Sequence, residues 1–437
     1  MESYLAPRPW LSTQAASFEQ QIIEQIRDLD PPAILSEIER LVTWADQIHD
    51  HESVNLNPAT NTMSPRAVKV LTSGIGGRPS LGHPGDKYEM GLEAIEQIET
   101  IAASLACRVF RAKYAEIRVP SGAIGNLYGF LATCSPGDTI IAPPPEIGGH
   151  VTHHQAGAAG LAGLQIVAAP VVAGEYTVDV SAVDRLAGEH HPALITIGGS
   201  LNLTPHSVGD LRGIADRHGA KLLFDAAHLS GLIAGGQWPN PLDEGAHLMT
   251  MSTYKSLAGP PAGLVVSNDA EIAERLDAIA FPGLTANFDA AKSAALAVTL
   301  TDWLVYGAAY AEAMVQAAQR LANELADRRV DVVTTPGGHT SSHAFALDAR
   351  TRGGGHHTAQ HLRRANILTS AIGLPSGLDD GVRVGTNEIV RWGATDNDMA
   401  ELAELFANAL QETNPEKVAP AVTAYRQRFT SLAYCQS

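Results

Sequence analysis

The chain contains 437 residues, of which 45% are hydrophobic and 18% are charged, a balance typical of globular proteins that argues against a disordered chain. Its 47 acidic and 30 basic residues give a formal net charge of -17, which disfavours nucleic acid or an anionic membrane as a partner. The length favours two packed domains or one large domain with an appended smaller one, and the charge favours a small-molecule partner.

Cysteine usage and the N-terminal residues bear on the cellular compartment. The chain has three cysteines, Cys107, Cys134 and Cys435. Their odd number and the lack of CxxC spacing argue against a disulfide framework and against a zinc site. Residues 1–20 lack the basic region and apolar core of a signal peptide. The weakly polar run 156–174 is interrupted by Gln165 and Pro170, so it predicts a helix end and a strand instead of a membrane span. We therefore expect a cytoplasmic protein.

Two short helices are expected first. Residues 20–50 place apolar side chains at helical spacing, and Pro31 and Pro32 break the pattern, so an N-terminal helical arm is predicted over residues 1–60.

An α/β domain is expected next, over residues 61–300. Between Ile117 and Val266 about seven short β-rich runs alternate with helical or glycine-rich stretches: AEIRV, DTIIA, LQIVAAPVV, ALITIG, KLLFD, HLMTMS and AGLVVS. Several runs are continuously apolar, as in strands that helices cover on both faces. The pattern predicts a mostly parallel seven-stranded sheet.

The last part of the chain predicts a smaller α+β domain, residues 301–437. From about Ala290 a long helical pattern connects the two domains, and it is followed by strand-like DVVTT and HAFALDA and by a last helix, MAELAELFANAL.

The strongest chemical signal lies at the ends of two predicted strands. Asp225 and His228 follow KLLF, and Lys255 follows TMSTY before a turn rich in glycine and proline. Ligands of open α/β sheets bind at such carboxyl ends. A pyridoxal 5'-phosphate (PLP) site needs a lysine for the covalent imine link and a carboxylate against the pyridine nitrogen. Alone, each residue would more often be a turn residue, a structural histidine or a solvated lysine.

Two further features match the needs of PLP and of an amino-acid substrate. In IRVPSGAIGNLYGFLA, a strand runs into a helix at Ser121, Gly122 and Ala123, where free N–H groups could hold a phosphate. An SG pair at a helix start is also a common cap, and Ser200 after ALITIGG is equally ambiguous. Arg383, in GVRVGT, suits bidentate binding of a substrate carboxylate.

Together these motifs resemble the serine hydroxymethyltransferases, PLP enzymes of the aspartate aminotransferase fold (fold type I). The resemblance runs through most of the chain. It is carried by FDAAHLSGLIAGGQWPNPL, TMSTYKSLAGPPAGLVVSN and GVRVGT, with SPGDTIIAPPPEIGGHVTHH as a further anchor that includes His150 and His153.

The resemblance implies a role for each matched residue. Lys255 would carry the cofactor, Asp225 would pair with the pyridine nitrogen, and His228 would contact the ring-oxygen side. Arg383 would hold the substrate carboxylate, and Tyr254 would take the place of the family's histidine before the lysine. The resemblance also implies a set of cofactor contacts: Ser121, Gly122, Ala123, Ser200, Ser252 and, across a homodimer interface, Gly283.

Several departures from the family pattern bear on the substrate. The family's loop with Tyr, Glu and a Tyr-Tyr-Gly-Gly run corresponds to the rearranged RPSLGHPGDKYEMG. Matching on the shared Pro-Gly puts Leu81 where the family has the glutamate that folate-linked transfer needs, and Glu89 at a catalytic tyrosine position. Glu89 or His83 could then act as acid or base.

Three more positions differ from the family. Its ring-stacking histidine corresponds to Ile147, with His150 nearby as a cofactor contact. A serine that helps to bind substrate corresponds to Ala59, and an arginine after the lysine motif corresponds to Pro261.

These features predict a PLP-dependent aldolase or hydroxymethyltransferase that cleaves a serine-type β-hydroxy amino acid to an amino acid and an aldehyde, with tetrahydrofolate dependence open. An α-methylserine-type substrate fits because the cleavage needs a deprotonated β-hydroxyl and no α-hydrogen. The alternatives are a threonine transaldolase, a folate-dependent serine hydroxymethyltransferase, a transaminase or decarboxylase of the same fold, and a PLP-binding protein without catalysis.

Overall fold

The computed structural model describes residues 5–172 and 174–436, and the chain forms two compact units that divide between Ser53 and Val54. The predicted domain boundaries at residues 60 and 300 stay predictions, and the second falls within one continuous helix, α11 (Ala290–Asp327).

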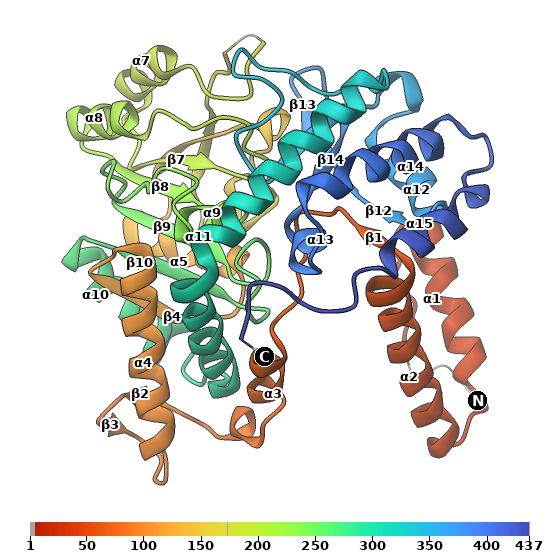
Figure 1. Ribbon diagram of the computed structural model, residues 1–437. Coiled ribbons are helices and arrows are strands. Elements are labelled where there is room, and N and C mark those ends of the chain that lie inside the picture. The colour runs from red at the N-terminus through yellow and green to blue at the C-terminus, as the bar shows by residue number, and fades with distance from the viewer. Residues whose placement is uncertain (1–4, 173, 437) are drawn as a thin grey trace. The chain divides into compact units, whose positions relative to one another are not determined.

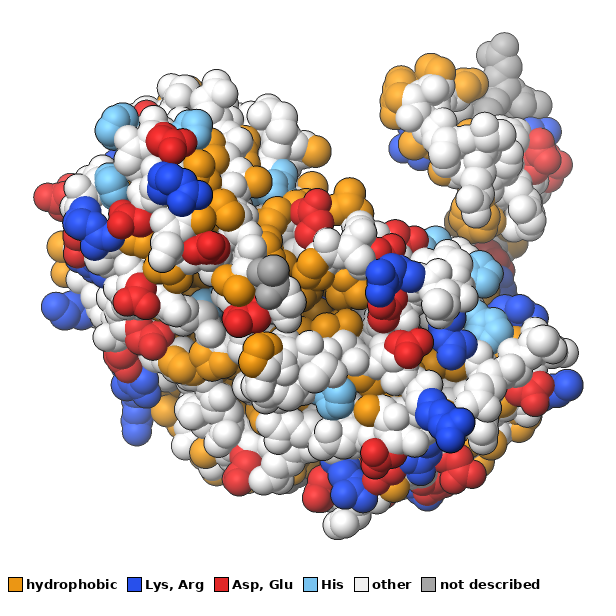
Figure 2. Space-filling model, turned by 90° about the horizontal axis from the view of Figure 1, so that it is seen from above, with side chains coloured by type: hydrophobic (Ala, Val, Ile, Leu, Met, Phe, Trp, Pro, Cys, Tyr) orange, Lys and Arg blue, Asp and Glu red, His pale blue; other side chains and the backbone are white. Residues whose placement is uncertain are grey.

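The first unit consists of two helices, α1 (Thr13–Ile26) and α2 (Pro31–Asp46), and a π-helical turn, η1 (Gln47–Glu52). The side chains of Ser12 and Asp30 cap the two helices by accepting backbone N–H groups. Pro31 and Pro32 lie in the first turn of α2, where a missing N–H costs little. Neither helix buries a residue, and apolar side chains of this unit are exposed at its surface (Figure 2).

The second unit is built on a seven-stranded sheet with the strand order β4-β10-β9-β8-β7-β5-β6 (Figure 1). All seven strands match runs predicted from the sequence. They are β4 (Tyr114–Val119), β5 (Thr139–Ala142), β6 (Gln165–Ala168), β7 (Leu194–Gly198), β8 (Lys221–Asp225), β9 (Leu248–Ser252) and β10 (Gly263–Ser267). Strands β5 to β9 pair in parallel, and β10 is antiparallel to both of its neighbours, so the mostly parallel sheet is confirmed.

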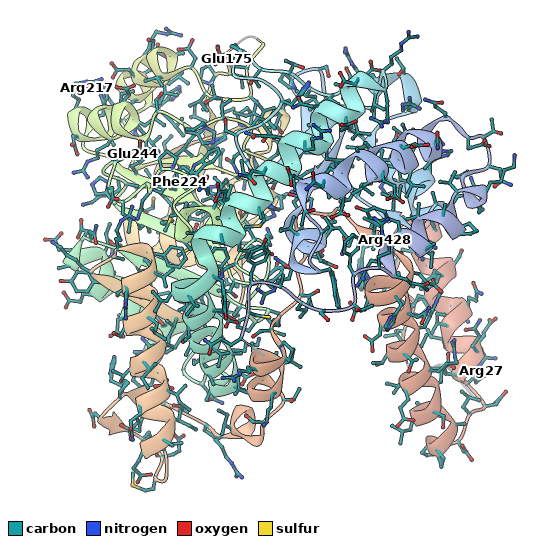
Figure 3. All side chains as sticks on the ribbon, viewed as in Figure 1. Arg27, Glu175, Arg217, Phe224, Glu244 and Arg428 are labelled. Carbon is teal, nitrogen blue, oxygen red and sulfur yellow. The ribbon has the colours of Figure 1, made fainter. Side chains whose placement is uncertain are left out.

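Hydrophobic cores cover both faces of this sheet, which explains its continuously apolar strands. On β8, Leu222 and Phe224 lie in one buried cluster and Leu223 lies in another, because successive side chains of a strand point to opposite faces. Figure 3 shows Phe224 inside this unit and Arg217 at its periphery. The flanking helices are α4 (Glu93–Phe110), α5 (Gly122–Thr133), α6 (Ala158–Leu161), α7 (Val180–His190), α8 (Val208–His218), α9 (Ser230–Ala234) and α10 (Ala270–Ala278).

Helix α11 leads from this sheet to a three-stranded antiparallel sheet with the order β11-β14-β13. Among the described residues, α11 is the one helix that is long and apolar enough to cross a membrane. However, 56% of its most apolar window is buried, and Leu300, Met314 and Leu321 lie in the hydrophobic core. We therefore interpret α11 as a core helix.

The smaller sheet and its helices agree with the predicted α+β region, with one correction. The strands are β11 (Ala344–Asp348), β13 (Ser370–Leu374) and β14 (Gly377–Gly385), and the helices are α12 (Gly355–Arg364), α13 (Asn387–Arg391), α14 (Met399–Gln411) and α15 (Ala419–Arg426). The strand expected at DVVTT is wrong: Val332 makes only an isolated bridge with Leu347. Its β-branched residues indicated a strand, but the local chain does not continue the ladder.

Short elements that the sequence did not indicate complete the unit. They are a parallel pair, β1 (Val54–Asn55) with β12 (Ile367–Leu368), the helix α3 (Pro65–Leu71) and a hairpin, β2 (Gly82–His83) with β3 (Asp86–Lys87).

Candidate active site

The predicted cofactor residues meet at the carboxyl ends of β8 and β9. Asp225 is the last residue of β8, and Lys255 follows the end of β9 by three residues. These strands are adjacent and parallel, so their ends lie at one edge of the sheet. Lys255 Nζ lies 3.0 Å from His228 Nε2, which joins the two motifs in space.

Burial changes the protonation of Lys255. The side chain is 7% exposed, and burial lowers the pKa of Lys255 to about 8, an effect that Asp225 opposes and Arg383 reinforces. A larger fraction of this amine is therefore unprotonated near neutral pH than in a solvated lysine. The unprotonated amine is the form that can attack an aldehyde.

Asp225 is held as a carboxylate by a buried network. His153 Nε2 and Asn126 Nδ2 both lie 2.9 Å from Asp225 Oδ2, and the N–H of Ala227 donates to Oδ1. Burial alone would raise the pKa of Asp225, but the hydrogen bond and charge of His153 hold it well below its usual range. Thr250 fixes the amide of Asn126 by donating to its Oδ1 at 2.6 Å.

His228 lies between two cationic side chains. Its Nε2 is 3.0 Å from Lys255 Nζ and 3.2 Å from Arg383 Nη1. Arginine has only N–H donors, so His228 Nε2 acts as the acceptor in that contact. Burial, Lys255 and Arg383 lower the pKa of His228 well below its ordinary value, so the ring is neutral.

Arg383 is a buried cation without a carboxylate partner among the described residues. It lies on β14 and is 7% exposed. Its Nη1 donates to the Ser200 carbonyl oxygen at 2.6 Å, and its Nε and Nη2 donate to Ser370 Oγ at 3.2 and 3.1 Å. Burial lowers the pKa of Arg383 to about 10. A buried guanidinium with only neutral partners is suited to receive the carboxylate of a ligand.

The start of α5 forms an anion cradle. Ser121 caps the helix by accepting the N–H of Ile124, while the N–H groups of Gly122 and Ala123 have no partner within the helix. A Cβ at position 122 would collide with the hydroxyl of Ser252 at the end of β9, so only glycine allows this close approach. The cradle therefore combines a helix N-terminus with hydroxyl groups, which suits a phosphate.

The donor set fits PLP. An amine of lowered pKa, a buried carboxylate, a buried arginine and a phosphate cradle lie around the ends of neighbouring elements, and the Nδ1 atom of His228 is buried without a partner in the described residues. No described group of three or more His, Cys, Asp or Glu side chains could hold a metal ion.

Comparison with known proteins identifies the family. The family model described as serine hydroxymethyltransferase matches residues 36–406. The chain belongs to the serine hydroxymethyltransferase family. It is therefore a PLP-dependent enzyme.

Similar proteins within this family include α-methylserine aldolases and serine hydroxymethyltransferases. An α-methylserine aldolase of Variovorax paradoxus is 56% identical over 434 residues, which cover 98% of each chain. An α-methylserine aldolase of Ralstonia sp is 49% identical over 435 residues, covering 98% of this chain and 99% of that protein. A serine hydroxymethyltransferase of Korarchaeum cryptofilum is 36% identical over 401 residues, covering 87% of this chain and 92% of that protein.

Two residues predicted from the family resemblance are not brought to Lys255 within one chain. Glu89 lies beyond the β2–β3 hairpin, which is apart from β9 in Figure 1, and its Oε2 accepts the N–H of Leu81. Gly283 is exposed on the turn η5 (Ile279–Leu284), and the nearest atom to a Cβ there would be the Ala278 carbonyl oxygen. Their roles stay predictions that require a second copy of the chain.

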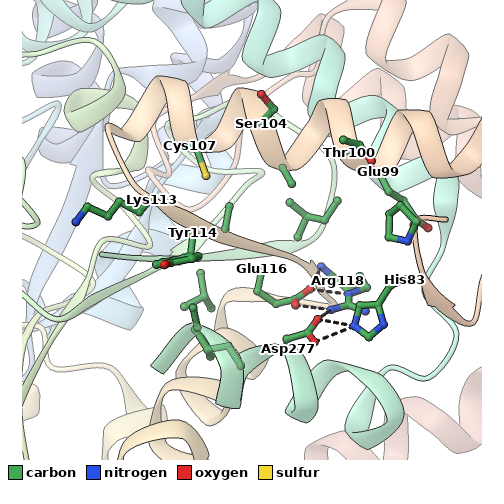
Figure 4. Close-up of a pocket in the computed structure, with 17 residues that line it drawn as sticks. His83, Glu99, Thr100, Ser104, Cys107, Lys113, Tyr114, Glu116, Arg118 and Asp277 are labelled. Atoms are coloured by element: carbon green, nitrogen blue, oxygen red, sulfur yellow. Dashed lines mark hydrogen bonds and ion pairs between the residues drawn. The ribbon is translucent and has the colours of Figure 1, made fainter. Parts of the chain in front are cut away.

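A pocket of about 500 Å³ lies along β4 between α4 and α10 (Figure 4). Its lining residues do not include Lys255, Asp225, His228 or Arg383. It contains His83, which pairs with Asp277 at 2.8 Å. Arg118 pairs with Asp277 and Glu116 in the same pocket. The structure thus places His83 in a charge network at the edge of the sheet, and not beside Lys255.

The structure favours His150 over Ile147 as the neighbour of the cofactor. Ile147 is 5% exposed and belongs to the hydrophobic core, whereas the charges of Asp225, Lys255 and Arg383 act on His150. Thr152 holds the Nδ1 atom of His150 at 2.9 Å. Tyr254 is half-buried beside Lys255.

Sequence reasoning missed several polar residues around this site. Asn126 lies four residues after Gly122 on α5, and this helical spacing was a usable signal for a shared face. Asn57, Asn61 and Ser370 had no such signal. Asn61 Nδ2 donates to the Lys255 carbonyl oxygen at 2.9 Å, although 194 residues separate them.

Proposed function

We propose that this protein is an α-methylserine aldolase, which cleaves the Cα–Cβ bond of α-methylserine to alanine and formaldehyde without tetrahydrofolate. The observation that carries the proposal is the similarity to α-methylserine aldolases along 98–99% of the chain, at 49–56% identity. The arrangement of Lys255, Asp225 and Arg383 supports PLP chemistry on an amino acid.

The chain's own residues have separate tasks in this reaction. Lys255 would hold the cofactor through its amine and, once released from it, would carry the proton that the reaction moves. Asp225 would place its negative charge against the pyridine nitrogen, and Arg383 would bind the substrate carboxylate. The bound cofactor would supply an acceptor for the electron pair that the broken Cα–Cβ bond releases. The β-hydroxyl loses its proton as formaldehyde leaves, and Cα gains a proton to give alanine, so the reaction needs no water and no oxidant.

The segment that carries Ala59 supports a substrate with an extra α-methyl group. Ala59 is half-buried, and its N–H donates to Asn57 Oδ1 at 3.1 Å. The same segment is tied to the site by Asn61, which donates to the Lys255 carbonyl oxygen. The resemblance matches Ala59 to a serine that helps to bind substrate in the family, and the methyl side chain of alanine is smaller than that serine and carries no hydroxyl.

A homodimer with shared sites is part of this proposal. The first unit exposes large apolar side chains, among them Phe18, Ile38, Val42 and Trp44, and a second copy would cover them. Glu89 and Gly283 could then reach the partner's site. A cytoplasmic location remains our expectation from the sequence.

The test is an assay of the purified holoenzyme with α-methylserine, L-serine and L-threonine, each with and without tetrahydrofolate. We expect formaldehyde and alanine in equal amounts from α-methylserine, at a rate that tetrahydrofolate does not change. A Lys255→Ala variant should release no formaldehyde above background.

Other products would overturn the proposal in favour of a specific alternative. An absolute need for tetrahydrofolate would indicate a hydroxymethyltransferase. Acetaldehyde formed from threonine only with an acceptor aldehyde would indicate a transaldolase. A stable pyridoxamine form after addition of a keto acid would indicate a transaminase.

A further inference from the structure

Arg383 and Ser370 face each other across neighbouring strands. Ser370 begins β13, Arg383 lies on β14, and the two residues are direct partners in the antiparallel register. Directly opposed residues project from the same face of a sheet, so their side chains meet. Ser370 Oγ lies 3.2 Å from Arg383 Nε and 3.1 Å from Nη2.

The direction of these hydrogen bonds follows from the chemistry of the two groups. A guanidinium has five N–H donors and no acceptor, so the Ser370 oxygen must accept both contacts. The hydroxyl proton of Ser370 therefore has to point elsewhere. Asn57 Oδ1 lies 3.2 Å from Ser370 Oγ and can accept that proton.

The Asn57 side chain is itself fixed. Its Oδ1 also accepts the N–H of Ala59 at 3.1 Å, and its backbone N–H donates to Asn55 Oδ1 at 3.1 Å. Asn55 in turn donates to the buried carboxylate of Glu388 at 2.8 Å. Asn57, the acceptor that orients the Ser370 hydroxyl, is thus held by contacts within its own segment, and that segment is held by α13.

We propose that Asn57 and Ser370 are positioning residues that orient Arg383 for the substrate carboxylate without neutralising its charge. The inference rests on the proposed role of Arg383 in the aldolase. Ser370 occupies the Nε–Nη2 edge of the guanidinium, and the Ser200 carbonyl holds Nη1. The neutral partners leave the positive charge of the buried guanidinium available to an incoming anion.

The experiment compares two ligands that differ by one carboxylate. Alanine and ethylamine share the amine and the methyl group, and only alanine can engage Arg383. Their dissociation constants are measured by calorimetry with the holoenzyme and with Ser370→Ala, Ser370→Thr and Ser376→Ala variants. Ser376 is exposed in the turn between the same two strands, so it serves as the matched control.

We expect Ser370→Ala to raise the dissociation constant of alanine about tenfold, the size of one hydrogen bond to a charged group, and to leave that of ethylamine unchanged. Ser370→Thr keeps the hydroxyl and should bind alanine as the wild type does, and Ser376→Ala should change neither constant. Equal weakening of both ligands, or no change for alanine, would overturn the proposal.

A double-mutant cycle tests whether Asn57 acts through Ser370. It also provides a second variant if one of the two single variants folds poorly. Asn57→Leu removes the acceptor for the Ser370 hydroxyl, so it should weaken alanine binding, and combination with Ser370→Ala should add little. If the two substitutions instead raise the dissociation constant of alanine by independent factors that multiply, Asn57 does not act through Ser370. If the wild type itself binds ethylamine as tightly as alanine, the proposed role of Arg383 fails, and this outcome is distinct from a failure of the positioning pair.

Discussion

At the scale of single residues, the site combines buried groups whose pKa values are set by burial and by their hydrogen-bond partners. Lys255 and Arg383 are buried cations with lowered pKa values, and Asp225 stays ionised because His153 and Asn126 satisfy it. Sequence spacing was enough to predict that Asp225, His228 and Lys255 lie together. It could not indicate His153 as the partner of Asp225, because the pair is separated by 72 residues.

The lowered pKa of Lys255 predicts how the apoenzyme reacts with PLP at different pH values. Only the unprotonated amine reacts, so the rate should rise about tenfold per pH unit below pH 8 and level off above it. Stopped-flow absorbance near ~420 nm measures this rate. A rate that keeps rising toward 10.5, the ordinary pKa of lysine, would contradict the burial argument, and Lys255→Ala provides the blank.

At the scale of elements, the ends of helices and strands build the cofactor site. The strand-to-helix pattern around Ser121 predicted the cradle, and the structure shows why residue 122 is glycine: the hydroxyl of Ser252 on β9 occupies the space of a side chain. The pattern could not reveal that contact, since β9 begins more than a hundred residues later in the chain.

A side chain at position 122 should weaken cofactor binding. Gly122→Val would push α5 away from β9 and disturb the N–H groups of the cradle, so the dissociation constant of PLP should rise at least about tenfold, as for one lost charge-assisted hydrogen bond. Fluorescence titration of the apoenzyme measures it. Gly209→Ala, in the first turn of α8 and without a close neighbour, is the matched control, and equal affinities for the two variants would refute the argument.

At the scale of the whole molecule, the first unit and the second differ in how they bury apolar side chains. The second unit contains the hydrophobic cores, whereas α1 and α2 bury none of their residues. Two amphipathic helices that expose their apolar faces gain little stability alone. This imbalance supports the proposed dimer.

Substitutions on the exposed apolar face of α2 test the proposed dimer. Wild-type protein should sediment at twice the chain mass of 46.1 kDa. Ile38→Asp with Val42→Asp places two charges on one apolar face, because residues four apart in a helix share a face, so the population should move toward the monomer. Glu39→Gln on the same helix should leave the mass unchanged. A monomeric wild type, or a double variant that sediments as the wild type does, would contradict the dimer.

The sequence by itself determined the strands of the large sheet and the main chemical groups of the site. Apolar runs of strand length predicted all seven strands of the large sheet, and strand ends marked Asp225 and Lys255, because these signals are local. The strand predicted at DVVTT is wrong, because its β-branched residues do not continue a ladder.

Only the tertiary structure decided which side chains surround those residues. Asn57 and Ser370 are 313 residues apart, and Arg383 meets Ser200 across 183 residues, so no local pattern encodes either contact. Burial, and with it the pKa of Lys255 and Arg383, also arises only when the elements pack together. The residue types in the sequence therefore indicate the chemistry of the site, whereas the fold determines its geometry.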